Sequence, residues 1–131
     1  MILLDTHAWL WWLSQSPALS RAARSAIAES ARTDGVAVST ISTWELALLV
    51  ARQRIELRIP VTDWVQASES IAELSFVAPS NRIMLESVSL PGPFHADPAD
   101  RIIVATARTH GLRVVTKDDK IRAYAHVESI W

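Results

Sequence analysis

Short apolar runs alternate with longer helical patterns along this chain of 131 residues. Each run ends at a polar residue or a proline, and continuous apolar runs of this length are typical of buried strands. The runs predict strands at Ile2–Leu4, Val36–Ser39, Leu74–Ala78 and Leu112–Thr116. The last of these follows Gly111, and the second follows the turn signal Asp34-Gly35.

The segments between these runs repeat apolar residues at helical spacing. They predict helices at roughly Ser20–Thr33, Thr43–Arg54, Thr62–Glu73, Asn81–Ser89 and Pro98–His110. Strands that alternate with helices predict a central parallel sheet with helices on both faces. We therefore expect a three-layer α/β/α fold. The chain contains no repeat, linker or low-complexity tract, so we expect residues 1–131 to form a single domain.

Composition narrows the functional classes. Half of the residues are apolar and there is no cysteine, which excludes disulfides, thiolate catalysis and thiolate metal sites. No apolar run approaches the roughly 18 residues of a membrane span, and we expect a cytoplasmic protein without membrane contact. The formal net charge of -1 argues against a broad basic surface for nucleic acid, but it leaves room for a local site.

Four carboxylates follow the predicted strands. Asp5 ends the first strand, Glu45 lies in the first turn of the helix after the second, Asp100 lies in the first turn of the helix from Pro98, and Asp118 follows the last strand. The carboxyl ends of parallel strands and the first turns of the following helices meet at one edge of an open sheet. We therefore expect these four side chains to converge there.

Asp100 makes this expectation sharper. Ile103, Val104 and Ala107 stand three, four and seven residues after it and form the face of the helix that turns to the sheet. Two carboxylates about 5 Å apart repel by about 3 kcal/mol at an effective dielectric near 20, and a divalent cation would offset that repulsion. Oxygen ligands without thiolates favour Mg²⁺, with Mn²⁺ as a substitute.

Each acid also has a structural interpretation. Asp97-Pro98-Ala99-Asp100 is a good helix start with Asp97 as N-cap, and Ser42 to Glu45 matches a capping box. Asp118 fits an ordinary loop acid. A carboxylate that ends a buried strand has little structural use, so Asp5 is the hardest to explain this way. Four such coincidences at one edge favour a site.

Four segments together resemble a known family: "MILLDTHAWLWWL", "VSTISTWELALL", "HADPADRIIVATARTHGLRVVTKDDKI" and the closing "VESIW". They are similar to the PIN-domain family, and within it to the VapC-like toxins of bacterial toxin-antitoxin pairs. The resemblance implies a metal-dependent endoribonuclease that is inhibited by a small antitoxin protein and is commonly a homodimer. The acidic residues of the family map onto Asp5, Glu45, Asp100 and Asp118.

The chemistry of these acids predicts a mechanism. Asp5, Asp100 and Asp118 would hold one or two Mg²⁺ ions that bind the scissile phosphate and activate a water for attack on phosphorus. Glu45 would orient or deprotonate that water. We expect a single-stranded or looped RNA substrate, because a cluster at a sheet edge must reach a backbone phosphate without a groove to dock in.

Neighbouring residues receive smaller roles. Asp97 is expected to support the ligands or to cap its helix. Arg101 lies on the predicted wet face, where it either touches a phosphate or is simply solvated. Thr6 and Thr116 either hydrogen-bond metal waters or act as caps. Both His7 and His95 are expected to be structural, since neither has a matched base and nucleophile beside it.

The tryptophans near the start of the chain lie on different faces of a predicted helix. Trp9, Trp12 and Leu13 share a helical face that predicts a core position, whereas Trp11 points elsewhere and is a candidate for an interface.

Two other functional classes stay open at this point. A phosphoacceptor receiver domain also has acids at the carboxyl edge of a parallel sheet, and Lys117 imitates its lysine. However, the chain offers only Asp5-Thr6 where such a domain needs an acidic pair. The other class is a PIN-fold binding module that has lost catalysis.

Overall fold

The computed structural model describes all of residues 1–131 and contains one sheet of five parallel strands. The strands lie in the order β3-β2-β1-β4-β5. Their bounds are β1 (Ile2–Leu4), β2 (Val36–Ser39), β3 (Leu74–Val77), β4 (Val114–Val115) and β5 (Ser129–Ile130). β1 is central, pairing with β2 on one side and β4 on the other, with Leu3 opposite Ala37 and Val114.

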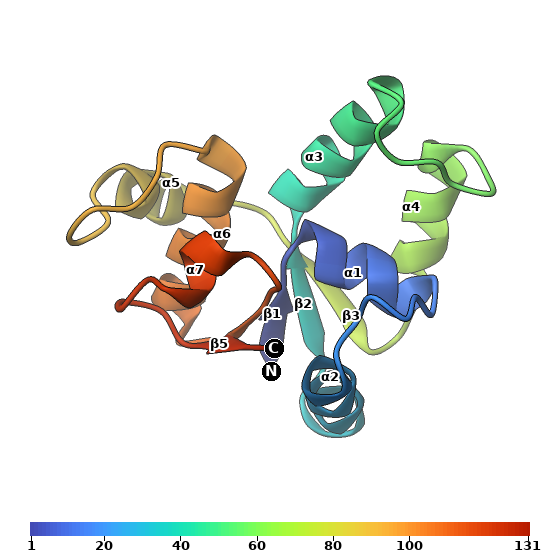
Figure 1. Cartoon of the computed structure of the whole chain (residues 1–131), viewed down its shortest axis with the longest axis horizontal. Coiled ribbons are helices and arrows are strands. Elements are labelled where there is room, and N and C mark those ends of the chain that lie inside the picture. Colours follow the sequence, from blue (N-terminus) through green and yellow to red (C-terminus); the bar gives the residue numbers. More distant parts are fainter.

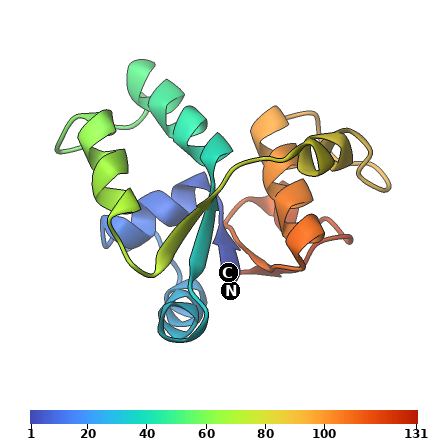
Figure 2. The same ribbon diagram turned by 180° about the vertical axis from the view of Figure 1, so that it is seen from behind.

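Seven helices surround the sheet. They are α1 (Thr6–Leu13), α2 (Arg21–Thr33), α3 (Thr40–Ala51), α4 (Val61–Glu69), α5 (Asn81–Val88), α6 (Pro98–His110) and α7 (Asp119–Arg122). Figure 1 shows α1 and α4 to the right of the strands and α5, α6 and α7 to the left, and Figure 2 shows the same layers from behind. The predicted three-layer α/β/α fold is confirmed. None of the helices combines the length and hydrophobicity that a membrane crossing requires.

The alternation of side chains along β1 explains the two layers. Ile2 and Leu4 turn to one face, where they join a core with Trp9 of α1 and Ile27 of α2. Leu3 turns to the other face and packs in a cluster with residues of α6. Because all three residues of β1 are buried, the strand reads as a continuous apolar run rather than an alternating one.

The bounds of α6 match the prediction because its ends carry strong local signals. The side chain of Asp97 accepts a hydrogen bond from the backbone N–H of Asp100, and Pro98 occupies the first turn. Gly111 ends the helix in the left-handed conformation at φ 65°, which favours glycine. The helix is therefore fixed at both ends, and its first turn holds Asp100 against the upper end of the sheet.

The prediction for α3 was wrong at its start. The helix begins at Thr40 because the side chain of Ser39, the last residue of β2, accepts a hydrogen bond from the N–H of Ile41. Ser42 is therefore buried inside the helix and does not cap it. The capping-box interpretation of Glu45 fails with it. No bounds were predicted for α1, α7 or β5, and β4 is shorter than predicted.

Candidate metal centre

The predicted acids lie where the sheet ends and the helices begin. Asp5 joins β1 to α1, Glu45 lies in the second turn of α3, Asp100 lies in the first turn of α6, and Asp118 precedes α7. In Figure 1 these junctions surround the upper end of the strands. Asp5 and Asp118 thus come from strand-to-helix junctions, and Glu45 and Asp100 come from within helices, with Glu45 one turn later than predicted.

Asp5 is buried, and each of its two oxygens accepts one hydrogen bond, which leaves a lone pair on each for a cation. Its Oδ1 accepts a hydrogen bond of 2.8 Å from the backbone N–H of Ala8, and its Oδ2 accepts one of 2.5 Å from the hydroxyl of Thr116. Burial raises the pKa of the Asp5 carboxyl, and the hydrogen bonds from Thr116 and Ala8 partly offset that rise. Asp5 therefore has a structural use after all, because it caps α1 and ties β1 to the segment after β4.

Asp100 is in a different environment. Burial raises the pKa of its carboxyl to about 7, and the negative charges of Asp97, Asp118, Glu45 and Asp5 add to the rise. The fold therefore brings these four acids close enough to Asp100 to interact with it. A half-buried carboxylate surrounded by like charges is where a bound cation is most stabilising.

His95 lies beside Asp100, although only a structural role was predicted for it. Its Nε2 lies 3.0 Å from Oδ2 of Asp100, within ion-pair distance. That nitrogen is buried and has no partner in hydrogen-bond geometry. Donor atoms of His95, Asp100 and Asp118 all lie within 4.8 Å of one another. His95 is the residue of this cluster that sequence reasoning missed, because it lies in an irregular loop where no period indicates its direction. His7, by contrast, is exposed and contacts the ring of Trp11.

Asp118 belongs to a chain of hydrogen bonds that leads to Asp5. Its carboxylate caps α7 by accepting from the backbone N–H groups of Lys120 and Ile121. Its own N–H donates to the hydroxyl oxygen of Thr116 at 3.0 Å, and that hydroxyl donates to Asp5. Thr116 is completely buried and holds the two acids in register.

Thr6 plays a similar part on the other side, because its buried hydroxyl donates to Ser42 of α3 at 2.9 Å. This contact joins the first residue of α1 to the helix that carries Glu45.

Arg101 does not lie in the solvated position that was predicted for it. Its guanidinium group is half-buried and donates to the backbone oxygens of Ser87, Phe94 and His95 at 2.7 to 3.2 Å. The side chain therefore holds the loop between α5 and α6, so the predicted solvated position is wrong, and contact with a phosphate stays a prediction. By holding the carbonyl of His95, Arg101 also keeps the imidazole beside Asp100. Asp97, as its cap interpretation predicted, accepts from the N–H of Asp100.

The donor set fits a divalent cation. The cluster combines carboxylate oxygens, which suit Mg²⁺ and Mn²⁺, with one imidazole nitrogen, which suits transition-metal ions, so the donor set fits a divalent cation without selecting one. The crowding of negative charge around Asp100 also indicates a cation site, because a bound cation would neutralise the negative potential there.

Comparison with known proteins decides the family. The sequence profile of the PIN domain matches residues 2–127. The chain belongs to the PIN-domain family. It is 42% identical over 125 residues to Ribonuclease VapC22 of Mycobacterium tuberculosis, an alignment that covers 95% of this chain and 92% of that protein. The resemblance seen in the sequence is thereby confirmed.

Solved structures share the fold of this PIN domain. VapBC2 from Rickettsia felis, bound to a promoter DNA fragment, gives a TM-score of 0.70 at 16% identity and covers 98% of this chain and 97% of that one. A toxin-antitoxin complex from Klebsiella pneumoniae gives a TM-score of 0.66 at 21% identity and covers 97% of this chain and 95% of that one. FitAcB from Neisseria gonorrhoeae gives a TM-score of 0.66 at 22% identity and covers 98% of this chain and 96% of that one. The receiver-like alternative is wrong, because β3, which would carry the acceptor acid, is an edge strand that ends at Val77.

Proposed function

We propose that this PIN domain is a VapC-like toxin of a toxin-antitoxin pair, a metal-dependent endoribonuclease that cleaves single-stranded or looped RNA in the cytoplasm. One observation carries the proposal: the Asp100 carboxyl lies among four further acids that raise its pKa. The identity with a named ribonuclease supports the reaction class.

The chain's own residues divide the work. Asp5, Asp100 and Asp118 hold the ion, which we take to be Mg²⁺ with Mn²⁺ as a substitute. When bound, the ion supplies charge neutralisation at the scissile phosphate and a more acidic water. Glu45, free of any capping duty, accepts a proton or orients the attacking water. Thr116 keeps Asp5 and Asp118 in place, and the buried side of the cluster limits the water that can reach it.

Cleavage of a mixed single-stranded RNA by the purified chain, with and without Mg²⁺, tests this proposal. Asp100→Asn should lower the cleavage rate by more than about 100-fold, since losing a ligand exceeds the 10- to 100-fold loss typical of changes behind the ligands. Asp119→Asn is the matched control, because that neighbouring acid is 96% exposed. Equal cleavage by all three proteins would point to a contaminating nuclease and contradict the proposal, and a wild type that cleaves no RNA with or without Mg²⁺ would favour the binding module that the sequence left open.

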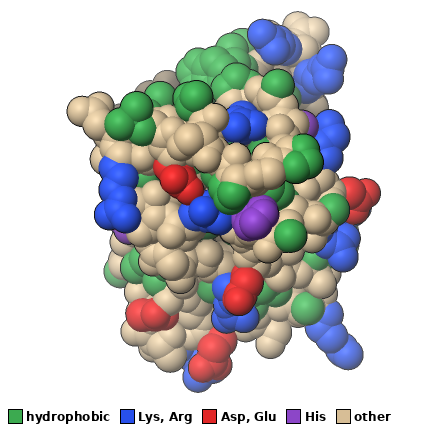
Figure 3. Space-filling view, turned by 90° about the vertical axis from the view of Figure 1, so that its left-hand side faces the viewer, with side chains coloured by type: hydrophobic (Ala, Val, Ile, Leu, Met, Phe, Trp, Pro, Cys, Tyr) green, Lys and Arg blue, Asp and Glu red, His purple; other side chains and the backbone are tan.

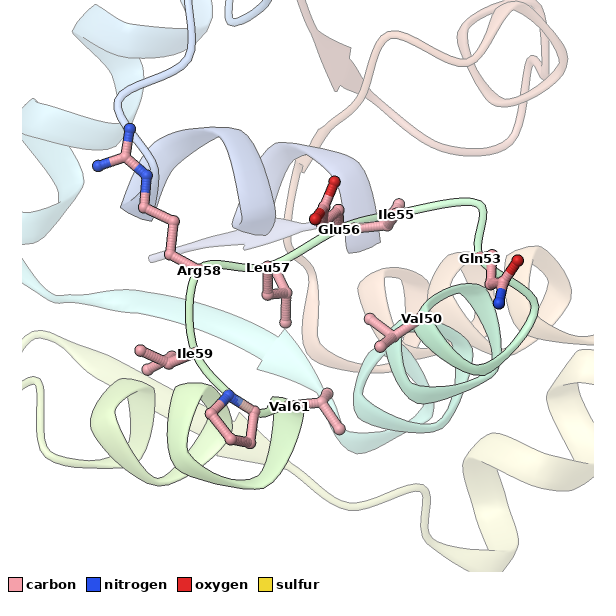
Figure 4. Close-up of a pocket in the computed structure, with 9 residues that line it drawn as sticks. Val50, Gln53, Ile55, Glu56, Leu57, Arg58, Ile59 and Val61 are labelled. Carbon is pink, nitrogen blue, oxygen red and sulfur yellow. The ribbon is translucent and has the colours of Figure 1, made fainter.

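We further propose a small antitoxin protein as the partner. Two apolar hollows flank the segment of residues 56–59 that joins α3 to α4. In the first, Val50, Leu57 and Val61 point toward one another while Arg58 points away (Figure 4). The second includes Trp11, which is half-buried against Trp131.

An amphipathic antitoxin segment would lie across both hollows, and a basic side chain of that segment would enter the acidic cluster in place of metal. Co-purification with the product of the neighbouring reading frame, followed by RNA cleavage across a Mg²⁺ titration, tests this. A tight complex that cleaves as fast as the free chain would exclude inhibition. Inhibition that excess Mg²⁺ never relieves would exclude only the basic side chain.

We also propose a homodimer. The exposed face of α5 carries Met84, Leu85 and Val88, of which Leu85 is 72% and Val88 is 80% exposed. Hydrophobic side chains gather in the upper half of this side of the molecule (Figure 3). Light scattering of the wild type and of Leu85→Glu measures the mass directly, and a monomeric wild type would contradict the proposal.

A further inference from the structure

A cavity of about 470 Å³ lies between the loop that joins α5 to α6 and the loop that follows α7. These loops lie side by side at the left of Figure 1 and at the right of Figure 2. Small-ligand pockets commonly occupy about 300–1,000 Å³. The lining is rich in rings and includes Gly92, Phe94, His95, Lys120, Tyr124 and His126.

Four rings form a continuous series in this lining. The ring centres of His95 and Phe94 are 4.5 Å apart, those of Phe94 and Tyr124 are 4.7 Å apart, and those of Tyr124 and His126 are 5.3 Å apart. The planes are inclined by 47° to 60°, so none of the rings covers its neighbour face to face. Tyr124 is buried and supports the series from behind, whereas Phe94 is half-buried and His126 is exposed.

The cavity is joined to the metal centre at two points. His95 lines it and also places Nε2 3.0 Å from the Asp100 carboxylate. Lys120 lines it, and its backbone N–H donates to Asp118 at 2.9 Å. A phosphate held at the acids would therefore lie next to the opening of the cavity, with the Lys120 ammonium nearby.

We propose that this cavity binds an unstacked nucleobase of the RNA beside the scissile phosphate and so contributes to the choice of cleavage site. The inference rests on the proposed function and deepens it. Single-stranded RNA is recognised mainly through bases that stack on aromatic or histidine rings, with basic side chains on the backbone. The inclined faces of Phe94 and His126 supply the first element, and Lys120 supplies the second.

Arg101 holds part of the cavity lining in place. Its guanidinium bonds to the carbonyls of Phe94 and His95, so the two rings closest to the metal centre are fixed before any RNA arrives. A preformed ring pair loses little conformational entropy on binding, which is the condition under which a single base adds measurable affinity.

Nuclear magnetic resonance on the ¹⁵N-labelled full chain tests base binding without relying on cleavage. The probes are 5′-AMP and 5′-UMP, with ribose 5-phosphate as the base-free control. Both nucleotides should shift the resonances of Phe94, Tyr124 and His126, and ribose 5-phosphate should not. His126→Ala should weaken nucleotide binding by about tenfold, as expected for the loss of one stacking ring. His110→Ala, an exposed histidine at the far end of α6, should leave binding unchanged.

Cleavage supplies the second readout. The distribution of nucleotides at the cut, determined by sequencing the products of a mixed RNA, should change in His126→Ala and in Lys120→Ala but not in His110→Ala or Arg122→Ala. Phe94 is left intact because its loop helps to hold His95.

The proposal is overturned if nucleotides shift no resonance of the cavity, or if ribose 5-phosphate shifts the same set. An unchanged cut distribution in both cavity variants also overturns it. A wild type that cleaves no RNA defeats the proposed function, and the nucleotide titration then still decides whether the cavity takes a base.

Discussion

Asp5 and Asp100 are acids of one cluster, and burial raises the pKa of both, yet the fold surrounds them with different partners. Asp5 is 8% exposed and each of its oxygens accepts a hydrogen bond from the protein. Asp100 has a partly exposed side chain, and its neighbours are four further acids and an imidazole nitrogen without hydrogen-bond geometry. The Asp5 side therefore belongs to the framework of the fold. The Asp100 side carries an electrostatic cost that an incoming cation would relieve.

The difference teaches how one residue type serves two purposes. A carboxylate that is held by a helix N-terminus and a hydroxyl is positioned without any ion. A carboxylate crowded by like charges, by contrast, is stabilised when a cation binds beside it. Stability measurements on the metal-free protein should separate the two sides.

The largest effect is expected from pH. The Asp100 carboxyl titrates near 3.8 when unfolded and at about 7 when folded, so the folded state holds this proton more tightly. The free energy of unfolding should therefore fall as pH rises from about 4 to about 7, by an order of 2–4 kcal/mol, and should level off above. Asp100→Asn cannot lose the proton. Urea unfolding in EDTA should show the variant as the more stable protein at pH 8, with the gap closing toward pH 4.

The control for that experiment is Asp119→Asn, which changes an exposed acid next to the cluster. Its stability should follow that of the wild type at every pH. A difference between wild type and Asp100→Asn that stays constant from pH 4 to pH 8 would show that Asp100 titrates normally and would remove the contrast with Asp5.

A smaller effect of opposite sign is expected at Asp5. Asp5→Ala removes the cap of α1 and leaves the Thr116 hydroxyl without its acceptor, which should lower the free energy of unfolding by about 2 kcal/mol. Thr116→Val breaks only one of the two contacts and should cost about half as much. Urea unfolding of both variants in EDTA at pH 8 provides the measurement. If Asp5→Ala stabilises the protein as Asp100→Asn does, then Asp5 too is held under repulsion.

The smallest effect is that of the ion itself. Mg²⁺ or Mn²⁺ at ten times its dissociation constant should stabilise the folded wild type by about 1.4 kcal/mol, or roughly 3–5 °C in Tm. Asp100→Asn should respond much less, and Asp119→Asn should respond like the wild type. Thermal unfolding across millimolar concentrations measures this. A Tm that ignores both ions would mean that the cluster does not bind them in that range.

The fold was largely predictable because its signals are local. Ile2–Leu4 and Val36–Ser39 are buried apolar runs with the predicted bounds, and α6 was placed by its cap, its proline and Gly111. The start of α3 was not predictable in this way. Ser39 and Ser42 are both suitable N-caps, and only the tertiary contact of the Ser42 hydroxyl with Thr6 decides between them.

The candidate site was predictable only in part for a related reason. A carboxylate that follows a strand, such as Asp5 or Asp118, has a position that topology dictates, and Asp100 joins them because the cap at Asp97 fixes where α6 begins. His95 lies in a loop whose path depends on the carbonyl contacts of Arg101, and a sequence pattern carries no information about such contacts. The wet-face placement of Arg101 failed because helical periodicity says nothing about a loop that folds back over the helix.

The hydrogen bond from Thr116 to Asp5 joins residues 111 positions apart in the sequence. During synthesis the amino-terminal segment leaves the ribosome first. The sheet around β1 is therefore incomplete until β4, its neighbour on the second side, has been synthesised. A nascent chain that stops before residue 116 contains Asp5 and Asp100 but lacks both the hydroxyl that holds Asp5 and the third acid. The order of translation thus withholds the complete cluster until nearly the whole domain has been made.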